Sequence, residues 1–461
     1  LSTQYSVLGI CLVVVALGLA IARLPLTVAA LLVGGTAATV LVAVRPAFGL
    51  VLLAFSVPFE SYAQVTLGGF SVSSTQALTA LTVAVWLASC IARESWEPGP
   101  ARLIVVPPLL LVTVAFLAAQ LLAMTGTFDV QTSVKELLKW GSFAAIYLVA
   151  VNVVGSEERR WLVGAVLVAA TLEALVGVYQ FLWRVGPEGH AIGAYMRAHG
   201  DFGQPNPFAG YLLFATPLAT AVAFGALRAR ALPLAVVAAG VAGVTALAIA
   251  MSLSRGAWLG LGLGLAAMLC LTNVRAWLVA AVASSVAVGL LLSFELLPQA
   301  IVTRIDTAVV FFGVFDVRTA NLTEYSWAII DRMAHWQAAW EMFVDRPLLG
   351  IGPGNYPVAY PAYAISGWPE PYGHAHNIYL NFLAETGVVG TLAYVLFLLW
   401  AARDLIRARN TGDWLNRAVV VGCFGVFVAV GGHNFFDNLT VHGMNVQLAL
   451  TLGLGVGSRS Y

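Results

Sequence analysis

Long apolar runs dominate this chain and limit what it can fold into. A straight helix needs ~20 apolar residues to cross a bilayer. Several runs are shorter, so we expect about 12–14 spans, two of them re-entrant or merged. The runs lie at about residues 5–22, 26–44, 47–58, 77–92, 104–123, 135–154, 161–183, 207–224, 232–251, 256–271, 277–294, 388–402, 418–436 and 442–456.

Composition supports the same fold class and excludes others. Charged residues make up 10% of the chain, against ~25% in soluble domains. The sequence therefore predicts an all-α polytopic membrane protein. The first run lacks a basic leading segment and a second run follows closely, so we interpret it as a span and not a cleaved signal. A net charge of +1 argues against nucleic acid as a partner. All four cysteines lie in apolar runs, which predicts neither a disulfide framework nor a cysteine metal site.

Arginine is distributed unevenly between the two sets of loops. One set holds thirteen arginines and six acidic residues, a net of +7, and the rest of the chain has a net of −6. An excess of lysine and arginine marks cytoplasmic loops, so the first set is predicted to face the cytoplasm. That set comprises the segments near Arg45, Arg93–Arg102, Gly155–Arg160, Arg228–Arg230, Arg275, Arg403–Arg417 and the C-terminal tail. All seven histidines then lie on or near the outer side: His190, His199, His335, His374, His376, His433 and His442.

Two outer loops are prominent, and the second is too long to be a simple connector. The first runs from Arg184 to Asn206. The second defines a three-part organisation: N-terminal spans over 1–294, a partly helical outer subdomain over 295–387, and C-terminal spans over 388–461. Within it, "RMAHWQAAWEMF" (332–343) has the apolar spacing of an amphipathic helix on the membrane surface. "RPLLGIGPGNY" (346–356) predicts a glycine and proline turn.

Two histidines precede an apolar run in "GHAHNIYLNFLAETGVVGT" (373–391). In an extended segment, His374 and His376 would point the same way. Asn377 suits an N-cap, with the helix beginning at Ile378. The positive end of that helix would keep a nearby imidazole neutral, and thus competent as a general base, and would favour an anionic group. In the alternative, both rings only make hydrogen bonds within the loop. A metal pair is a third possibility, but no HExxH motif and no nearby carboxylate triad supports it, so no metal is predicted.

Two arginines border apolar runs on the predicted outer side. Arg197 precedes the rigid Pro205–Asn206–Pro207 turn in "YMRAHGDFGQPNPFAGYLL" (195–213), although a solvated arginine at a helix end would fit equally. Arg255 in "MSLSRGAWLG" (251–260) lies between two apolar runs with few polar residues around it. Its side chain is therefore more expected to face a cavity or a partner than to snorkel to the membrane surface. Glu173 is the other intramembrane charge, and it could pair with an arginine or line a cavity.

These residue types fit one chemistry. The planar guanidinium of arginine binds phosphate oxygens with two parallel hydrogen bonds, so two or three arginines can hold and neutralise a diphosphate. A neutral histidine can take the proton of an attacking hydroxyl. No DxD-like pair is present in an outer loop, and neither a P-loop nor a Rossmann fingerprint is present, so no divalent metal or cofactor is expected.

The motifs resemble those of a known family. His376–Asn377, nine residues and then "GVVGT" (387–391) resemble the signature of bacterial O-antigen ligases. "FGQPNPFAGYL", "SRGAWLG" and "RMAHWQAAWEMFVDRPLLGIGPGNY" are similar to further stretches of the O-antigen ligase and polymerase superfamily, and they occur in the family's order. The similarity extends over most of the chain, although the outer loop is longer than the minimal form.

The resemblance implies a multispan GT-C glycosyltransferase without metal or nucleotide. Such an enzyme moves a glycan, with inversion, from an undecaprenyl-diphosphate carrier to an acceptor. By this analogy His376 is the base and Arg197 and Arg255 grip the diphosphate, while Arg332, His374, Asn377 and Asn206 are secondary candidates. The acceptor is a lipid A–core sugar in the ligase of a Gram-negative cell and a second lipid-linked repeat in the polymerase.

Two other classes remain open at this point. A transporter of lipid-linked sugars would show paired, similar halves with broken helices, and we see no such symmetry in the sequence. A structural subunit would have no need of its outer histidines.

Overall fold

The computed structural model describes residues 26–60, 64–67, 70–96, 104–272, 316–319 and 326–457, with single positions between 272 and 316. In these segments nine helices are long and apolar enough to cross a membrane, and three shorter apolar helices accompany them. The chain is thus an all-α polytopic membrane protein, as predicted. The spans expected at 5–22 and 277–294, and most of 295–325, lie outside the described residues.

Within the described residues the helices follow one another along the chain, and two short hairpins interrupt them. The helices are α2 (Leu26–Val44), α3 (Ala47–Ser56), α4 (Ser74–Trp96), α5 (Pro108–Ala123), α6 (Val130–Val153), α7 (Ser156–Trp183), α8 (Pro205–Leu212), α9 (Thr216–Arg228), α10 (Leu232–Met251), α11 (Arg255–Thr272), α14 (Trp327–Asp345), α15 (Tyr356–Tyr363), α16 (Ile378–Ala408), α17 (Trp414–His433) and α18 (Met444–Val456). The two antiparallel hairpins are β1 (Gln64–Leu67) with β2 (Phe70–Ser73), and β3 (Ala191–Ile192) with β4 (Tyr195–Met196).

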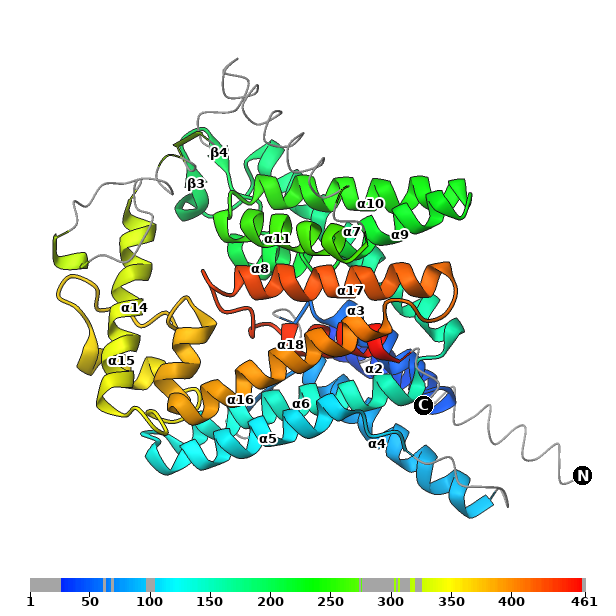
Figure 1. The fold of residues 1–461 in the computed structure, drawn as a ribbon, viewed down its shortest axis with the longest axis horizontal. Helices are drawn as coiled ribbons and strands as arrows, with labels where there is room; N and C mark the ends of the chain where they lie inside the picture. Colours follow the sequence, from blue (N-terminus) through cyan, green and yellow to red (C-terminus); the bar gives the residue numbers. More distant parts are fainter. Residues whose placement is uncertain are drawn as a thin grey trace, which may run out of the picture.

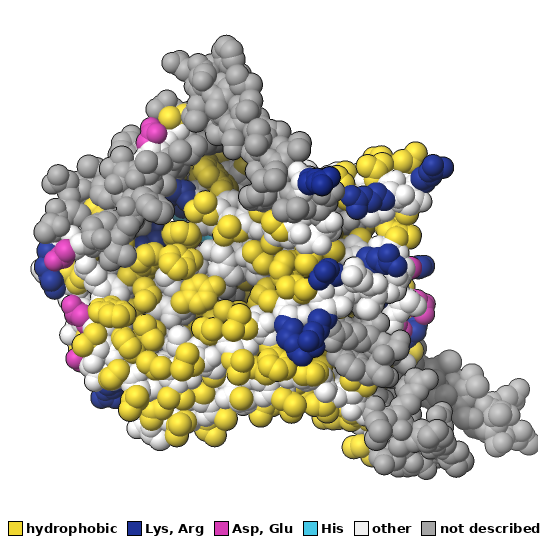
Figure 2. All heavy atoms as spheres, viewed as in Figure 1, with side chains coloured by type: hydrophobic (Ala, Val, Ile, Leu, Met, Phe, Trp, Pro, Cys, Tyr) yellow, Lys and Arg dark blue, Asp and Glu magenta, His cyan; other side chains and the backbone are white. Residues whose placement is uncertain are grey.

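The loops of the bundle gather at two opposite ends. At one end, here named the basic end, Arg45 pairs with Glu157 and Glu158, at 3.2 and 2.6 Å. At the same end the Arg159 side chain bonds Asn416. At the other end, here named the histidine end, α14, α15, β3 and β4 lie beyond the ends of α10, α11, α16 and α17 (Figure 1). Figure 2 shows a largely apolar flank between the ends, with several lysine and arginine side chains toward the basic end. The described loops near Arg45, Gly155–Arg160 and Arg403–Arg417 therefore lie together as predicted, and which end faces outward stays a prediction.

Small residues let the central helices pack closely. α17 packs against α9 and α11, α16 against α5, and α6 against α18. A Cβ at Gly260 or Gly264 of α11 would lie 2.5 Å from a backbone carbonyl oxygen of α17. Close packing of this kind stabilises helix pairs where lipid removes the hydrophobic driving force. These contacts fix where the first residues of α11 and the last residues of α17 meet.

The region of α14 and α15 rests on a kink in α16. Gly387 has φ +58° and ψ −161°, so the helix bends there. The loop between α14 and α15 uses the freed backbone: the N–H of Val388 donates to the Pro347 carbonyl at 2.8 Å, and the N–H of Ile351 donates to the Ala384 carbonyl at 3.0 Å. The predicted helix over 332–343 exists as α14, which runs across the ends of α16 and α17 (Figure 1). The boundary predicted at residue 387 coincides with this kink, inside one helix.

Candidate functional site

The two histidines of 373–391 lie in a tight loop before α16. As predicted, Asn377 caps this helix: its side-chain oxygen accepts the N–H groups of Tyr379 and Leu380 at 3.0 Å each. The expected extended conformation is wrong, because His376 has a left-handed φ of +51°. The reason is a hydrogen bond that folds the loop over the helix, from the N–H of Ala375 to the Asn381 side chain at 3.0 Å.

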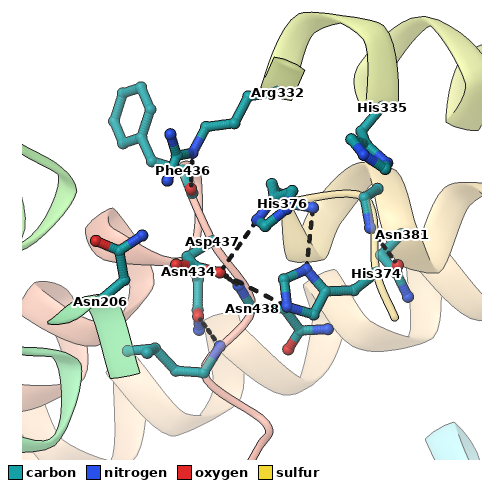
Figure 3. Close-up of polar contacts among 12 residues, drawn as sticks. Asn206, Arg332, His335, His374, His376, Asn381, Asn434, Phe436, Asp437 and Asn438 are labelled. Carbon is teal, nitrogen blue, oxygen red and sulfur yellow. Dashed lines mark hydrogen bonds and ion pairs between the residues drawn. The ribbon is translucent and has the colours of Figure 1, made fainter. Parts of the chain in front are cut away.

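Both imidazole rings converge on Asp437, which lies in the loop between α17 and α18. His374 Nε2 is 3.7 Å and His376 Nδ1 is 3.5 Å from the same oxygen, Oδ1 (Figure 3). Asn434 holds this loop against α16, because its carbonyl accepts the N–H of Ile378 at 2.9 Å. The rings therefore do face one space, around a buried carboxylate that the sequence places sixty-one residues beyond His376.

The tautomer of His374 follows from its backbone contact. The N–H of His376 donates to His374 Nδ1 at 3.1 Å, so this nitrogen keeps its lone pair. A neutral His374 then carries its proton on Nε2, the nitrogen that faces Asp437. Burial, and then the neighbouring His376, lower the pKa of His374 to about 4. His374 is therefore neutral at pH 7, and its Nε2–H faces Asp437 at 3.7 Å.

Asp437 sets the tautomer of His376 in turn. Burial would raise the pKa of Asp437, but contact with His376 and the charges of His376, His374 and His433 outweigh it, so its pKa lies well below the ordinary value. A carboxylate favours the proton on the nearest nitrogen of His376, which is Nδ1, and Nε2 keeps a lone pair. The distance of 3.5 Å is at the outer limit of a hydrogen bond, and such bonds are often long before substrate binds. The arrangement makes His376 a candidate general base.

Arg332 brings a positive charge from α14 to the same loop. Its Nε donates to the Phe436 carbonyl at 3.1 Å, and one terminal nitrogen donates to the Ala328 carbonyl at 2.7 Å. Trp336, one turn along α14, donates from Nε1 to the His376 carbonyl at 3.3 Å. The predicted secondary candidate Arg332 thus lies beside the histidines, where its charge contributes to the low pKa of His374.

Arg197 and Arg255 lie on neighbouring segments at the same end. Arg197 Nε donates to the Ser252 carbonyl at 2.8 Å, in the turn that leads to Arg255, the first residue of α11. A second nitrogen of Arg197 donates to the Asn206 side chain at 3.1 Å. Both arginines are partly exposed.

The first turn of α11 connects these arginines to the Asp437 loop. A Cβ at Gly256 would lie 2.8 Å from His433 Nδ1 and 3.1 Å from the Phe436 Cβ. In Figure 3, Asp437 lies between Asn206 and the two histidines. All seven predicted site residues thus lie at the histidine end, in two groups on either side of this loop.

Three residues of the site were not predicted from the sequence. All three reach His376 through packing between segments that are distant along the chain. Asp437, Asp331 and His335 were not singled out as site residues. Asp331 and His335 are one helical turn apart on α14, which was a detectable signal, whereas Asp437 had only its position after an apolar run. No carboxylate is close to His376 along the chain, yet in space it belongs to two groups with the donors of a metal site: Asp331, His335 and His376, and His374, His376 and Asp437.

Buried Glu173 supports the loop that contains Arg197. Among the described residues, the contacts of Glu173 include no arginine. Its side chain accepts the N–H of Asp201 at 3.1 Å. Gln180, two turns later on α7, accepts the N–H groups of His199 and Gly200 at 3.1 and 2.7 Å. The intramembrane acid therefore holds the segment that follows Arg197.

Part of the chain matches a known protein family. Residues 240–395 match the family model described as O-antigen ligase. No curated protein matches the chain. The matched segment contains Arg255, Arg332 and both histidines of the loop before α16. This match covers about a third of the chain and supports its membership of the O-antigen ligase superfamily.

Proposed function

We propose that the protein is an O-antigen ligase-like membrane glycosyltransferase that transfers a glycan from an undecaprenyl-diphosphate carrier to an acceptor hydroxyl at the outer face of the inner membrane. The observation that supports this most is the pairing of His376 with buried Asp437, 3.5 Å apart, at the end of the bundle opposite the basic loops. The family match supports an enzyme that acts on lipid-linked glycans.

The chemical step uses the unprotonated nitrogen of His376. The acceptor hydroxyl oxygen attacks the anomeric carbon from the face opposite the diphosphate, and the sugar–diphosphate C–O bond breaks with inversion. His376 Nε2 takes the hydroxyl proton, while the proton on Nδ1 remains there, facing Asp437. The carboxylate of Asp437 stabilises the imidazolium that forms. The electron pair leaves with the diphosphate of the carrier. His376 later returns the proton to solvent.

The arginines bind and neutralise the leaving group. Arg255 is the first residue of α11, so the positive end of that helix adds to its charge. Arg197 is held next to it through Ser252 and Asn206. Guanidinium groups fixed by such contacts stabilise the charge that develops on the diphosphate without reorganising during the reaction. Arg332 sits nearer the histidines and contributes positive charge on that side.

The test is glycan transfer by purified protein reconstituted with lipid-linked donor. His376→Ala and Arg255→Ala are expected to lose at least ~100-fold in kcat, because each removes a group that acts on the transition state. Arg318→Ala, which replaces an exposed arginine outside the cluster, serves as the control and should keep a normal rate. Near-normal transfer by both site variants would refute the mechanism. A product that remains on the carrier would identify the polymerase reaction instead.

A further inference from the structure

His335 is a buried histidine that the proposed transfer does not use. Its side chain lies on α14 with 0% exposure. The ring stacks on Tyr360, with centroids 4.6 Å apart, and meets the His376 ring edge-on at 5.3 Å. It is therefore packed directly behind the candidate base.

The contacts of Tyr356 fix the tautomer of His335. The Tyr356 hydroxyl donates its own proton to the His335 carbonyl at 3.2 Å. The contact of 2.9 Å between this hydroxyl and His335 Nδ1 must then use the proton of the imidazole. Nε2 is left with a bare lone pair.

That lone pair is buried and faces a carboxylate. His335 Nε2 has no hydrogen-bond partner and lies 3.8 Å from Asp331 Oδ1, too far for a hydrogen bond. Asp331 is itself only 7% exposed. A buried acceptor pointed at another acceptor is costly unless a cation lies between them.

We propose that Asp331, His335 and His376 form a binding site for Zn²⁺. One ligand atom from each lies within 4.8 Å of the others. Zinc–ligand bonds of ~2.0–2.1 Å in a tetrahedron separate ligand atoms by about 3.4 Å, so closure needs side-chain shifts of about 1 Å. The other ring nitrogen of His335, Nδ1, donates its proton to the Tyr356 hydroxyl. Metal-bound histidines make the same kind of hydrogen bond to a neighbouring group.

The second possible group, His374, His376 and Asp437, is a poorer zinc site. His374 Nδ1 accepts the backbone N–H of His376, so His374 Nε2 carries a proton and has no lone pair to give. Coordination there would require breaking this hydrogen bond. The first group requires no such break.

Zinc bound at Asp331, His335 and His376 inhibits transfer. With Nδ1–H held by Asp437, His376 offers Nε2 to the metal, and this is the nitrogen that acts as the base. This consequence rests on the proposed function, whereas zinc binding itself does not.

The binding test uses the full chain without a polyhistidine tag, freed of metal by a chelator and titrated with Zn²⁺ in a calorimeter. One zinc per chain is expected, with affinity at least ~10-fold weaker in His335→Gln and Asp331→Asn. His374→Gln, the matched control, should bind normally. Visible absorption of the Co²⁺ form should show a low-symmetry site that both ligand variants lose. Thermal melting checks that each variant is folded, and Asp331→Asn suffices if His335→Gln does not fold.

The outcomes separate the two proposals. Equal affinity in wild type, Asp331→Asn and any folded His335→Gln, or loss of binding only in His374→Gln, would overturn the zinc site. In the transfer assay, zinc should inhibit the wild type, a chelator should restore it, and Asp331→Asn should resist it. Zinc binding at this site in a protein that transfers no glycan would leave the site standing and remove the proposed function. Binding without inhibition of active protein would overturn the role assigned to it.

Discussion

At the scale of single residues, one carboxylate determines what the histidines can do. Asp437 is buried and has His374 Nε2 and His376 Nδ1 within 3.7 Å of one oxygen. The backbone of the loop has already fixed the proton of His374 on Nε2. Asp437 therefore chooses between the two tautomers of His376, and only the one with the proton on Nδ1 leaves Nε2 as a base.

Replacing Asp437 by Asn tests this positioning role. The amide is nearly the same size but can donate to Nδ1, which stabilises the wrong tautomer of His376. We expect kcat to fall by roughly 10²- to 10⁴-fold, as for the equivalent change in a serine protease triad, with KM and melting temperature little changed. The pH–rate profile should change as well, since the carboxylate no longer stabilises the imidazolium. A loss of stability in proportion to the loss of rate would instead show a purely structural role.

Two histidines, one buried and one half-buried, also make stability depend on pH. The pKa values of His374 and His335 are lowered from 6.5 to about 4 and about 3, mainly by burial. Below pH 6.5 these histidines become protonated in the unfolded chain but stay neutral in the folded protein. The free energy of unfolding therefore decreases as pH falls toward 4, by up to ~1.4 kcal/mol per pH unit for each histidine. Asp331, whose pKa burial raises, acts in the opposite sense and reduces the slope.

The measurement is the melting temperature in detergent between pH 7 and 5. We expect a decline in the wild type and a flatter curve in His374→Gln, which keeps an acceptor for the His376 N–H. Asp331→Asn should steepen the decline, because it removes the opposing group. A flat wild-type curve would contradict the neutral state of both histidines.

At the scale of elements, the kink in α16 accounts for the glycine spacing of its motif. Gly387 adopts φ +58° and ψ −161°, a conformation that glycine reaches without strain. A Cβ there would lie 2.4 Å from the carbonyl carbon and oxygen of Leu348. The close approach lets the α14–α15 loop bond to the opened helix, and it sets the position of α14 over the histidines.

Gly387→Ala should therefore weaken both the fold and the site. Strain and overlap together are expected to cost ~3 kcal/mol or more, since neither the backbone nor Leu348 can move freely. The melting temperature should fall, and transfer should fall with it because Arg332 and Trp336 lose their register. Gly164→Ala on α7 is the control, as its Cβ meets nothing within 4 Å and its backbone is helical. Equal stability of the two variants would rule out this account of the kink.

The elements also show which features were predictable. The N-cap Asn377, the helix from Ile378 and a helix over 332–343 follow from local signals, and the structure contains all three. The conformation of His376 was not predictable, because it depends on a hydrogen bond between Ala375 and Asn381. Asp437 and His335 join the site only through packing of α17 and α14 against α16, and a single sequence gives no measure of such contacts.

At the scale of the whole molecule, the two ends of the bundle have different chemistry. The basic end holds Arg45, Arg159 and Arg228, while the histidines and the region of α14 and α15 lie at the other. The apolar flank between them is where lipid would lie (Figure 2). Lysine and arginine near helix ends set orientation during insertion, so the basic end is expected to stay in the cytoplasm. A lipid-linked donor displayed on the outer leaflet would then reach His376.

Orientation can be measured by labelling single cysteines in a chain whose native cysteines are replaced. Ser366, exposed in the segment between α15 and α16, lies at the histidine end, and Asn410, exposed after α16, lies at the basic end. A membrane-impermeant maleimide added to intact spheroplasts should label Ser366→Cys and should label Asn410→Cys only after permeabilisation. Both variants must be present in equal amounts and melt like the parent protein. The reverse pattern would place His376 in the cytoplasm, away from any donor on the outer leaflet, and the proposed reaction could not occur there.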